Sequence, residues 1–75
     1  MVDFFDIHFN ADWIWAKAFD CVSKARGHVK INRHTEEFWT DCTEKNLFRR
    51  AMVHVLVDVR EGKLEQGSNR RVYWG

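Results

Sequence analysis

The sequence predicts a small α+β domain with three helices, one short strand and a C-terminal β-hairpin. The main evidence is the stretch 43–74, where apolar residues recur at spacings of three and four, as on one face of a helix. The members of this repeat are Leu47, Phe48, Ala51, Met52, Val55, Leu56 and Val59. Gly62 then predicts a helix end, and the turn-prone triplet Gly67-Ser68-Asn69 separates two segments of strand character.

Length and composition indicate one soluble domain. A chain of 75 residues makes at most one domain and buries only about 60% of its unfolded surface. Four Trp, six Phe and one Tyr supply the large apolar side chains that so short a chain needs. A formal net charge of only +1 excludes a strongly basic domain. Acidic residues gather in the N-terminal third and cations follow later, which permits a bipolar surface.

The first nine residues are open to two interpretations. Phe5, Ile7 and Phe9 alternate with polar residues, as in a half-buried strand. Apolar residues also recur at helical spacing from Phe4 through Ala25, so one long helix from Asp3 is the alternative. We favour an extended arm over residues 1–9, because Asn10 is a good N-cap for a helix that begins after it.

Two further helices and a strand are expected before residue 43. The segment 11–26 carries an apolar stripe at helical spacing, which Trp15 and Phe19 widen, and Gly27 ends it. His28 to Asn32 alternates like a short strand, and roughly 35–42 predicts a second helix that buries Phe38 and Trp39. Cys21 and Cys42 then fall within helices as reduced, buried thiols.

The long helix is expected to span about 43–61. Thr43 is its predicted N-cap, because a hydroxyl can accept a hydrogen bond from a free amide of the first turn. The end of this segment, Val53 to Val59, is rich in β-branched residues and also alternates with period two, so a strand is the alternative. We favour the helix because Leu47 to Met52 continues the same apolar face.

The order of these elements resembles the winged helix-turn-helix superfamily of DNA-binding domains. The residues that carry the resemblance are Thr43, the Lys45-Asn46 and Arg49-Arg50 face, the exit Arg60 to Glu65, and Arg70 to Trp74. It implies that residues 1–75 form a single winged-helix-like domain, with a recognition helix over about 43–61 and a wing over about 63–74. In such domains the recognition helix enters the major groove.

The resemblance implies a non-catalytic protein that binds double-stranded DNA, as a transcriptional regulator or accessory factor. One small module with few cations would bind DNA weakly alone, which makes a homodimer or a host protein a possible partner. Arginine suits contact with guanine and asparagine with adenine, whereas cations of a wing suit phosphate. The DNA-binding residues implied are Lys30, Arg33, Thr43, Lys45, Asn46, Arg49, Arg50, Ser68, Asn69, Arg70 and Arg71. The expected location is cytoplasmic, with nucleoid association if the protein binds DNA.

The alternative is a protein-interaction module, for example a small viral or mobile-element inhibitor of a larger host complex. Val53 and Val57 lie off the main stripe of the long helix, and Trp13 and Trp74 lie outside the expected core. Exposed Trp and an apolar ridge are typical of partner surfaces, and an exposed Trp also suits stacking on single-stranded bases.

No metal, cofactor, membrane contact or enzymatic activity is expected. His8, Cys21, His28, His34, Cys42 and His54 are the candidate ligands, and none forms the close pairs of a structural zinc site. So short a chain leaves little room for a catalytic cleft. The sequence also lacks a signal-peptide pattern and an apolar segment long enough to span a membrane.

Overall fold

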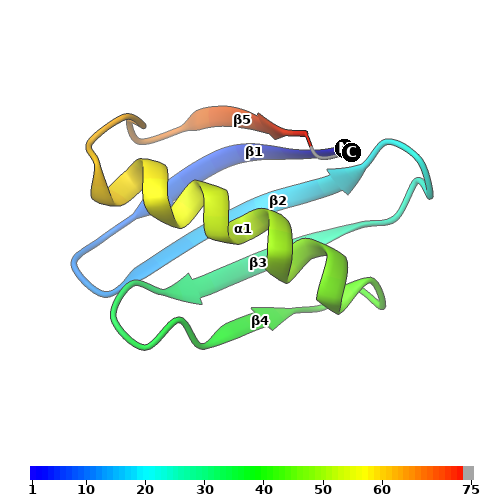
Figure 1. The fold of residues 1–75 in the computed structure, drawn as a ribbon, viewed down its shortest axis with the longest axis horizontal. Helices are drawn as coiled ribbons and strands as arrows, with labels where there is room; N and C mark the ends of the chain where they lie inside the picture. Colours follow the sequence, from blue (N-terminus) through cyan, green and yellow to red (C-terminus); the bar gives the residue numbers. More distant parts are fainter. Residues whose placement is uncertain (74–75) are drawn as a thin grey trace.

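The computed structural model describes residues 1–73 as a five-stranded antiparallel sheet with one helix on one of its faces (Figure 1). The elements in chain order are β1 (Val2–Phe9), β2 (Trp13–Asp20), β3 (Arg26–Asn32), β4 (Phe38–Thr40), α1 (Lys45–Arg60) and β5 (Ser68–Val72). The strand order across the sheet is β4-β3-β2-β1-β5. The first four strands therefore form a meander, and α1 carries the chain across the sheet so that β5 adds beside β1.

The core lies between α1 and the sheet face that it covers. The helix contributes Phe48, Ala51, Met52, Val55, Leu56 and Val59, and the strands contribute Val2, Phe4, Ile7, Ile14, Ala16, Ala18, Val29, Ile31 and Val72. Burial of each large apolar side chain is worth about 1.5–3 kcal/mol. Because successive residues of a strand point to opposite faces, the alternate residues of every strand point away from α1.

A β-bulge in β1 decides which of its residues face the helix. Phe5 lies opposite Lys17 and His8 lies opposite Trp15, so three steps along β1 match two along β2. Asp6 takes up the extra residue with a φ of 55°, in the left-handed region. As a result Phe4 and Ile7, three residues apart, are both buried against α1, whereas Phe5 and His8 are on the other face.

The winged helix-turn-helix prediction is wrong, because the described residues hold one helix rather than three. The segment 11–26 is strand β2 and a turn, and the expected helix at 35–42 is a loop and the short strand β4. Cys21 and Cys42 follow these strands in loops, where both thiols are half-buried and free. The expected arm at 1–9 is extended, but it is an inner strand of the sheet, between β2 and β5.

Two elements were predicted correctly. The long helix is α1, and Gly62, with a φ of 72°, follows its end as expected. Thr43 is not its cap, since Glu44 occupies the N-cap position without a side-chain hydrogen bond. The alternative strand at Val53–Val59 is also wrong, whereas the expected strand at 28–32 is β3.

The C-terminal hairpin predicted as a wing is absent from the described residues. Leu64 to Gln66 is not a strand, and β5 pairs with β1 in an antiparallel register that places Val72 opposite Val2. Two ion pairs fix β5 from both sides. Arg70 Nε lies 2.6 Å from Asp58 Oδ2 on α1, and Arg71 Nη2 lies 2.8 Å from Asp3 Oδ2 on β1.

We expect Leu56→Ala to destabilise the protein by about 2–5 kcal/mol, because it opens a cavity between α1 and the sheet. Val57→Ala, the next residue and an exposed one, is the matched control and should change stability by no more than about 0.5 kcal/mol. Urea unfolding followed by circular dichroism measures both. Equal effects of the two substitutions would contradict the placement of the core.

The buried Asp3 is expected to make stability depend on acid pH. The hydrogen bond from Arg71 is the main cause that lowers the pKa of Asp3 below its usual 3.8. The ionised form is therefore favoured in the folded state, so the stabilisation is present above pH ~4 and is lost as pH falls through the lowered pKa. Asp3→Asn should reduce the unfolding free energy at pH 7, with a difference from wild type that shrinks below pH ~4. Glu37→Gln, which changes an exposed carboxylate in a loop, is the control. A loss of unfolding free energy in Asp3→Asn that is the same at every pH would contradict the role of the ionised Asp3 carboxylate.

Candidate functional site

The sheet face that points away from α1 is covered by no element of residues 1–73, and we call it the open face. Strand β2 contributes Trp13, Trp15, Lys17 and Phe19 to it, because Ile14, Ala16 and Ala18 point to the helix. The remaining members are Asp3, Phe5 and His8 of β1, Arg26, His28 and Lys30 of β3, Trp39 of β4 and Arg71 of β5. Aromatic and cationic side chains dominate this set.

Three aromatic side chains of the open face are exposed to solvent. Phe5 and Trp15 are each 41% exposed and Trp39 is 48% exposed. In the register of the sheet, Lys30 lies opposite Trp15 on one side and opposite Trp39 on the other. Its ammonium lies 5.8 Å from the ring centre of Trp39 and 5.0 Å from that of Trp13. The ammonium of Lys30 thus lies over two indole rings, those of Trp13 and Trp39.

The cations of the open face outnumber the carboxylates on and beside it by four to three: Lys17, Arg26, Lys30 and Arg71 against Asp3, Asp6 and Asp41. Asp3 is held by Arg71, and the carboxylates of Asp6 and Asp41 are each bonded to a histidine. Within residues 1–73, Lys17, Arg26 and Lys30 form no ion pair. These three cations are therefore available to an anionic ligand.

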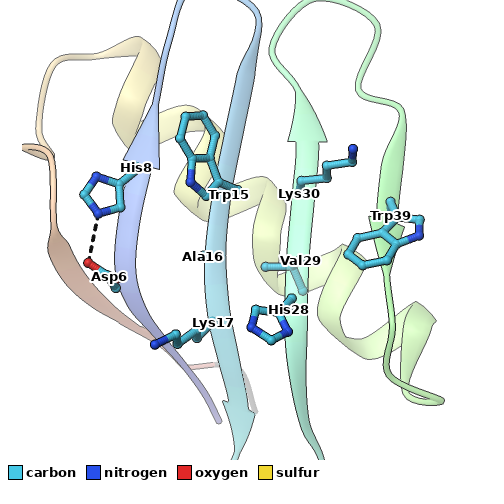
Figure 2. A pocket seen from close by; sticks show the side chains of 9 residues that line it. All are labelled: Asp6, His8, Trp15, Ala16, Lys17, His28, Val29, Lys30 and Trp39. Carbon is cyan, nitrogen blue, oxygen red and sulfur yellow. Dashed lines mark hydrogen bonds and ion pairs between the residues drawn. The ribbon is translucent and has the colours of Figure 1, made fainter.

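A hollow of about 310 Å³ lies in the middle of the open face (Figure 2). Its lining consists of Asp6, His8, Trp15, Ala16, Lys17, His28, Val29, Lys30 and Trp39. Figure 2 shows His8 on β1 and His28 on β3, on either side of β2, with Lys17 between them and Trp39 at the far side. The size is at the lower end of the range for small-molecule sites, about 300–1,000 Å³.

Each histidine of the hollow has a carboxylate partner. His8 Nε2 donates to Asp6 Oδ1 at 2.9 Å, and His28 Nδ1 donates to Asp41 Oδ2 at 3.0 Å. Asp41 Oδ1 also accepts the backbone N–H of His28 at 2.7 Å. The hydrogen bond from the His28 side chain is the largest cause that lowers the pKa of Asp41, followed by the bond from its backbone. Asp41 therefore stays ionised and fixes the orientation of the His28 ring.

Gly27 gives Asp41 the space for this contact. A Cβ at position 27 would lie 2.4 Å from Asp41 Oδ1 and 2.9 Å from Cys42 Cβ. Any larger residue at this position would displace the Asp41 carboxylate from His28 or open the sheet edge.

The DNA-binding residues implied by the sequence are divided between the two layers of the molecule. Thr43, Lys45, Asn46, Arg49 and Arg50 are exposed at the start of α1 and just before it, in the layer opposite the open face. Lys30 and Arg71 are on the open face. Arg70, the residue before Arg71, points to the helix layer, where it binds Asp58. One DNA surface does not include all of these residues.

The other implied DNA contacts have partners within the chain. Arg33 Nη1 donates to the carbonyl of Asn10 at 2.6 Å, and its guanidinium lies over the ring of Phe9. Ser68 Oγ accepts the N–H of Glu65, and Asn69 Oδ1 accepts the N–H of Asp6. These bonds connect the loops and β5 to their neighbours.

The residues proposed for a protein partner are likewise separated. Val53 and Val57 are 39% and 42% exposed on α1, as the off-stripe positions indicate. Trp13 is half-buried on the open face, beneath Lys30, and Trp74 lies outside the described residues. The two valines and Trp13 therefore belong to opposite layers.

The open face was not predicted from the sequence, because Trp15, Phe19 and Trp39 were expected in the core. Phe5, His8, Lys17 and His28 were not among the binding candidates either. Hydrophobic alternation does not indicate the face on β2, because Trp13, Trp15 and Phe19 are as apolar as Ile14, Ala16 and Ala18; Lys17, the one charged residue of this run, is the only local signal.

Comparisons with known protein families, with curated proteins and with solved structures find no match. Within residues 1–73, no group of three or more His, Cys, Asp or Glu side chains is arranged to hold a metal ion. Across the same residues, α1 falls short of the length and apolar character that a membrane-crossing helix needs.

Proposed function

We propose that the protein binds single-stranded nucleic acid across the open face. The observation that carries this proposal is the row across β2, β3 and β4 in which Lys30 lies opposite Trp15 on one side and Trp39 on the other. Both tryptophans are exposed, and Lys30 has no ion pair within residues 1–73. Nucleotide bases stack on such rings, and neighbouring cations bind the phosphates between them. Lys17 and Arg26 extend the positive charge along β2 and β3.

The shape of the open face favours a single strand over a duplex. Bases must be unstacked before they can stack on protein aromatic rings, and in a duplex they are already stacked on each other. A sheet of five strands also offers a broad surface rather than a rod that fits the major groove.

The aromatic rings are supported by the fold in a way that suits stacking. The ring of His8 stacks on that of Trp15, with centroids 6.2 Å apart and planes 28° apart. The bulge at Asp6 places His8 there, and the pairing of β3 with β4 places Trp39 beside Lys30. Rings held in position lose little conformational entropy when a base binds.

The test is fluorescence anisotropy with a labelled oligouridylate, an oligothymidylate and a duplex of equal length. We expect single strands to bind more tightly than the duplex. Trp39→Ala should weaken binding by about 5- to 150-fold, because one stacked base is worth roughly 1–3 kcal/mol. Lys30→Ala should weaken binding and reduce the salt slope by about 0.7, the contribution of one phosphate contact.

Two matched controls lie on the helix layer. Lys45→Ala removes the same charge from α1, and Val57→Ala truncates an exposed apolar residue there. Neither should change the affinity for single strands beyond a small, salt-dependent effect of Lys45. A single strand that fails to bind at low salt would overturn the proposal, as would a loss of binding in Lys45→Ala that equals the loss in Lys30→Ala.

A further inference from the structure

We propose that the open face holds a second binding site for the same single strand, at a hollow lined by Phe5 and Arg26. This inference rests on the proposed binding of single strands. It adds that one strand follows a diagonal path over the sheet, from Trp39 on β4 to Phe5 on β1. The ligand of the second hollow is a further base of that strand, together with its phosphate.

The second hollow has a volume of about 520 Å³ and adjoins the first one. Its lining consists of Phe5, Lys17, Ala18, Phe19, Arg26, Gly27 and His28. Lys17 and His28 lie opposite each other on β2 and β3, and both also line the first hollow. A strand bound in the first hollow can therefore enter the second without leaving the surface of the sheet.

Phe5 is the ring of the second hollow that is open to a base. Its side chain is as exposed as that of Trp15 in the first hollow. In the register of the sheet Phe5 lies opposite Lys17, and Figure 2 shows the Lys17 side chain directed from β2 toward β1. An exposed ring with a cation beside it can bind a base and a neighbouring phosphate together.

Phe19 has a different role, because two cations already lie over its ring. The guanidinium of Arg26 is 5.4 Å from the ring centre of Phe19, and the ammonium of Lys24 is 5.9 Å from it. These contacts hold both cations beside the second hollow. Neither cation forms an ion pair within residues 1–73, so both are available to phosphate. The guanidinium plane of Arg26 also suits stacking on a base.

The charge of the second hollow favours a strand with phosphates over an uncharged partner. The neighbouring carboxylates have partners of their own, since Asp3 is bonded to Arg71 and Asp41 is bonded to His28. The three lysine and arginine cations described above have none among the described residues. An uncharged peptide or lipid chain would cover the apolar lining but would leave these cations without a counter-charge.

The path through both hollows sets the length of strand that fits. Trp39 and Phe5 are three strand spacings and two residues apart, which gives a Cα separation of about 16 Å from standard sheet dimensions. Stacked bases advance about 3.4 Å per nucleotide along a strand, and unstacked bases advance further. A strand of about six nucleotides is therefore long enough to reach both rings.

The test is fluorescence anisotropy with oligouridylates of about three to twelve nucleotides, which cover the usual site sizes of single-strand binding domains. We expect the affinity of wild type to rise up to about six nucleotides and then to level off. Phe5→Leu should weaken binding of the longest strands about 5-fold or more, because it removes the stacking ring and keeps the apolar bulk. Arg26→Ala should reduce the salt slope by about 0.7, the contribution of one phosphate contact.

Two matched controls lie on α1, in the opposite layer. Val53→Ala truncates an apolar side chain that is exposed to nearly the same extent as Phe5, and Arg49→Ala removes an exposed cation. Neither should change the affinity beyond a small, salt-dependent effect of Arg49. Thermal unfolding followed by circular dichroism shows whether each variant is folded.

The double variant Phe5→Leu/Arg26→Ala separates the two proposals. Weaker binding that is confined to strands long enough to reach both hollows supports the second site. Long strands that bind the folded double variant as tightly as wild type would overturn the second site and leave binding at Trp15, Lys30 and Trp39 standing. Equal affinity of wild type for the shortest and longest strands would have the same meaning. A wild type that binds no single strand at low salt would overturn both proposals.

Discussion

Helix α1 buries six side chains against one face of the sheet, and the other features of the molecule depend on this contact. A helix of 16 residues is about 24 Å long and covers one side of a five-stranded sheet only. The second side of the sheet is therefore left to water within the described chain. Natural small domains usually place polar residues on such a face. Here Phe5, Trp15 and Trp39 occupy it instead. Contact of their apolar surface with water is unfavourable, and exposed apolar patches of this kind are typical of binding sites.

The helix could be predicted from sequence because its apolar residues keep one period over four turns and end at Gly62. Strand β2 could not be predicted from sequence, because Trp13, Trp15 and Phe19 make its outer face as apolar as the face that contacts α1. Where both faces are apolar, alternation is hidden, and the spacing of Ile14, Ala18 and Val22 imitates a helix. In β1 the bulge produces a similar effect, because it buries Phe4 and Ile7 at a spacing of three. The residues that misled the prediction are largely those of the candidate site.

The chemistry of the site was still less accessible from sequence. Lys30 and Arg71 were predicted as contacts to duplex DNA, together with residues of α1 that lie in the opposite layer. His28 and Asp41 are 13 positions apart, and only the pairing of β3 with β4 brings them together. His8 faces Trp15 because of one extra residue in β1. Register and bulges depend on the whole sheet, so the local sequence carries little information about them.

The addition of β5 beside β1 has a consequence for biosynthesis. β1 is synthesised before the other four strands of this sheet, and its second edge remains unpaired until Val72, opposite Val2, has been made. A nascent chain would therefore present an open strand edge with Phe4 and Ile7 uncovered, a state that invites pairing with other chains. Folding must close a loop of nearly the whole chain length, which is typical of slow folding. Shelter of the open edge of β1 by a chaperone would then matter more for this domain than for a helical one of equal size.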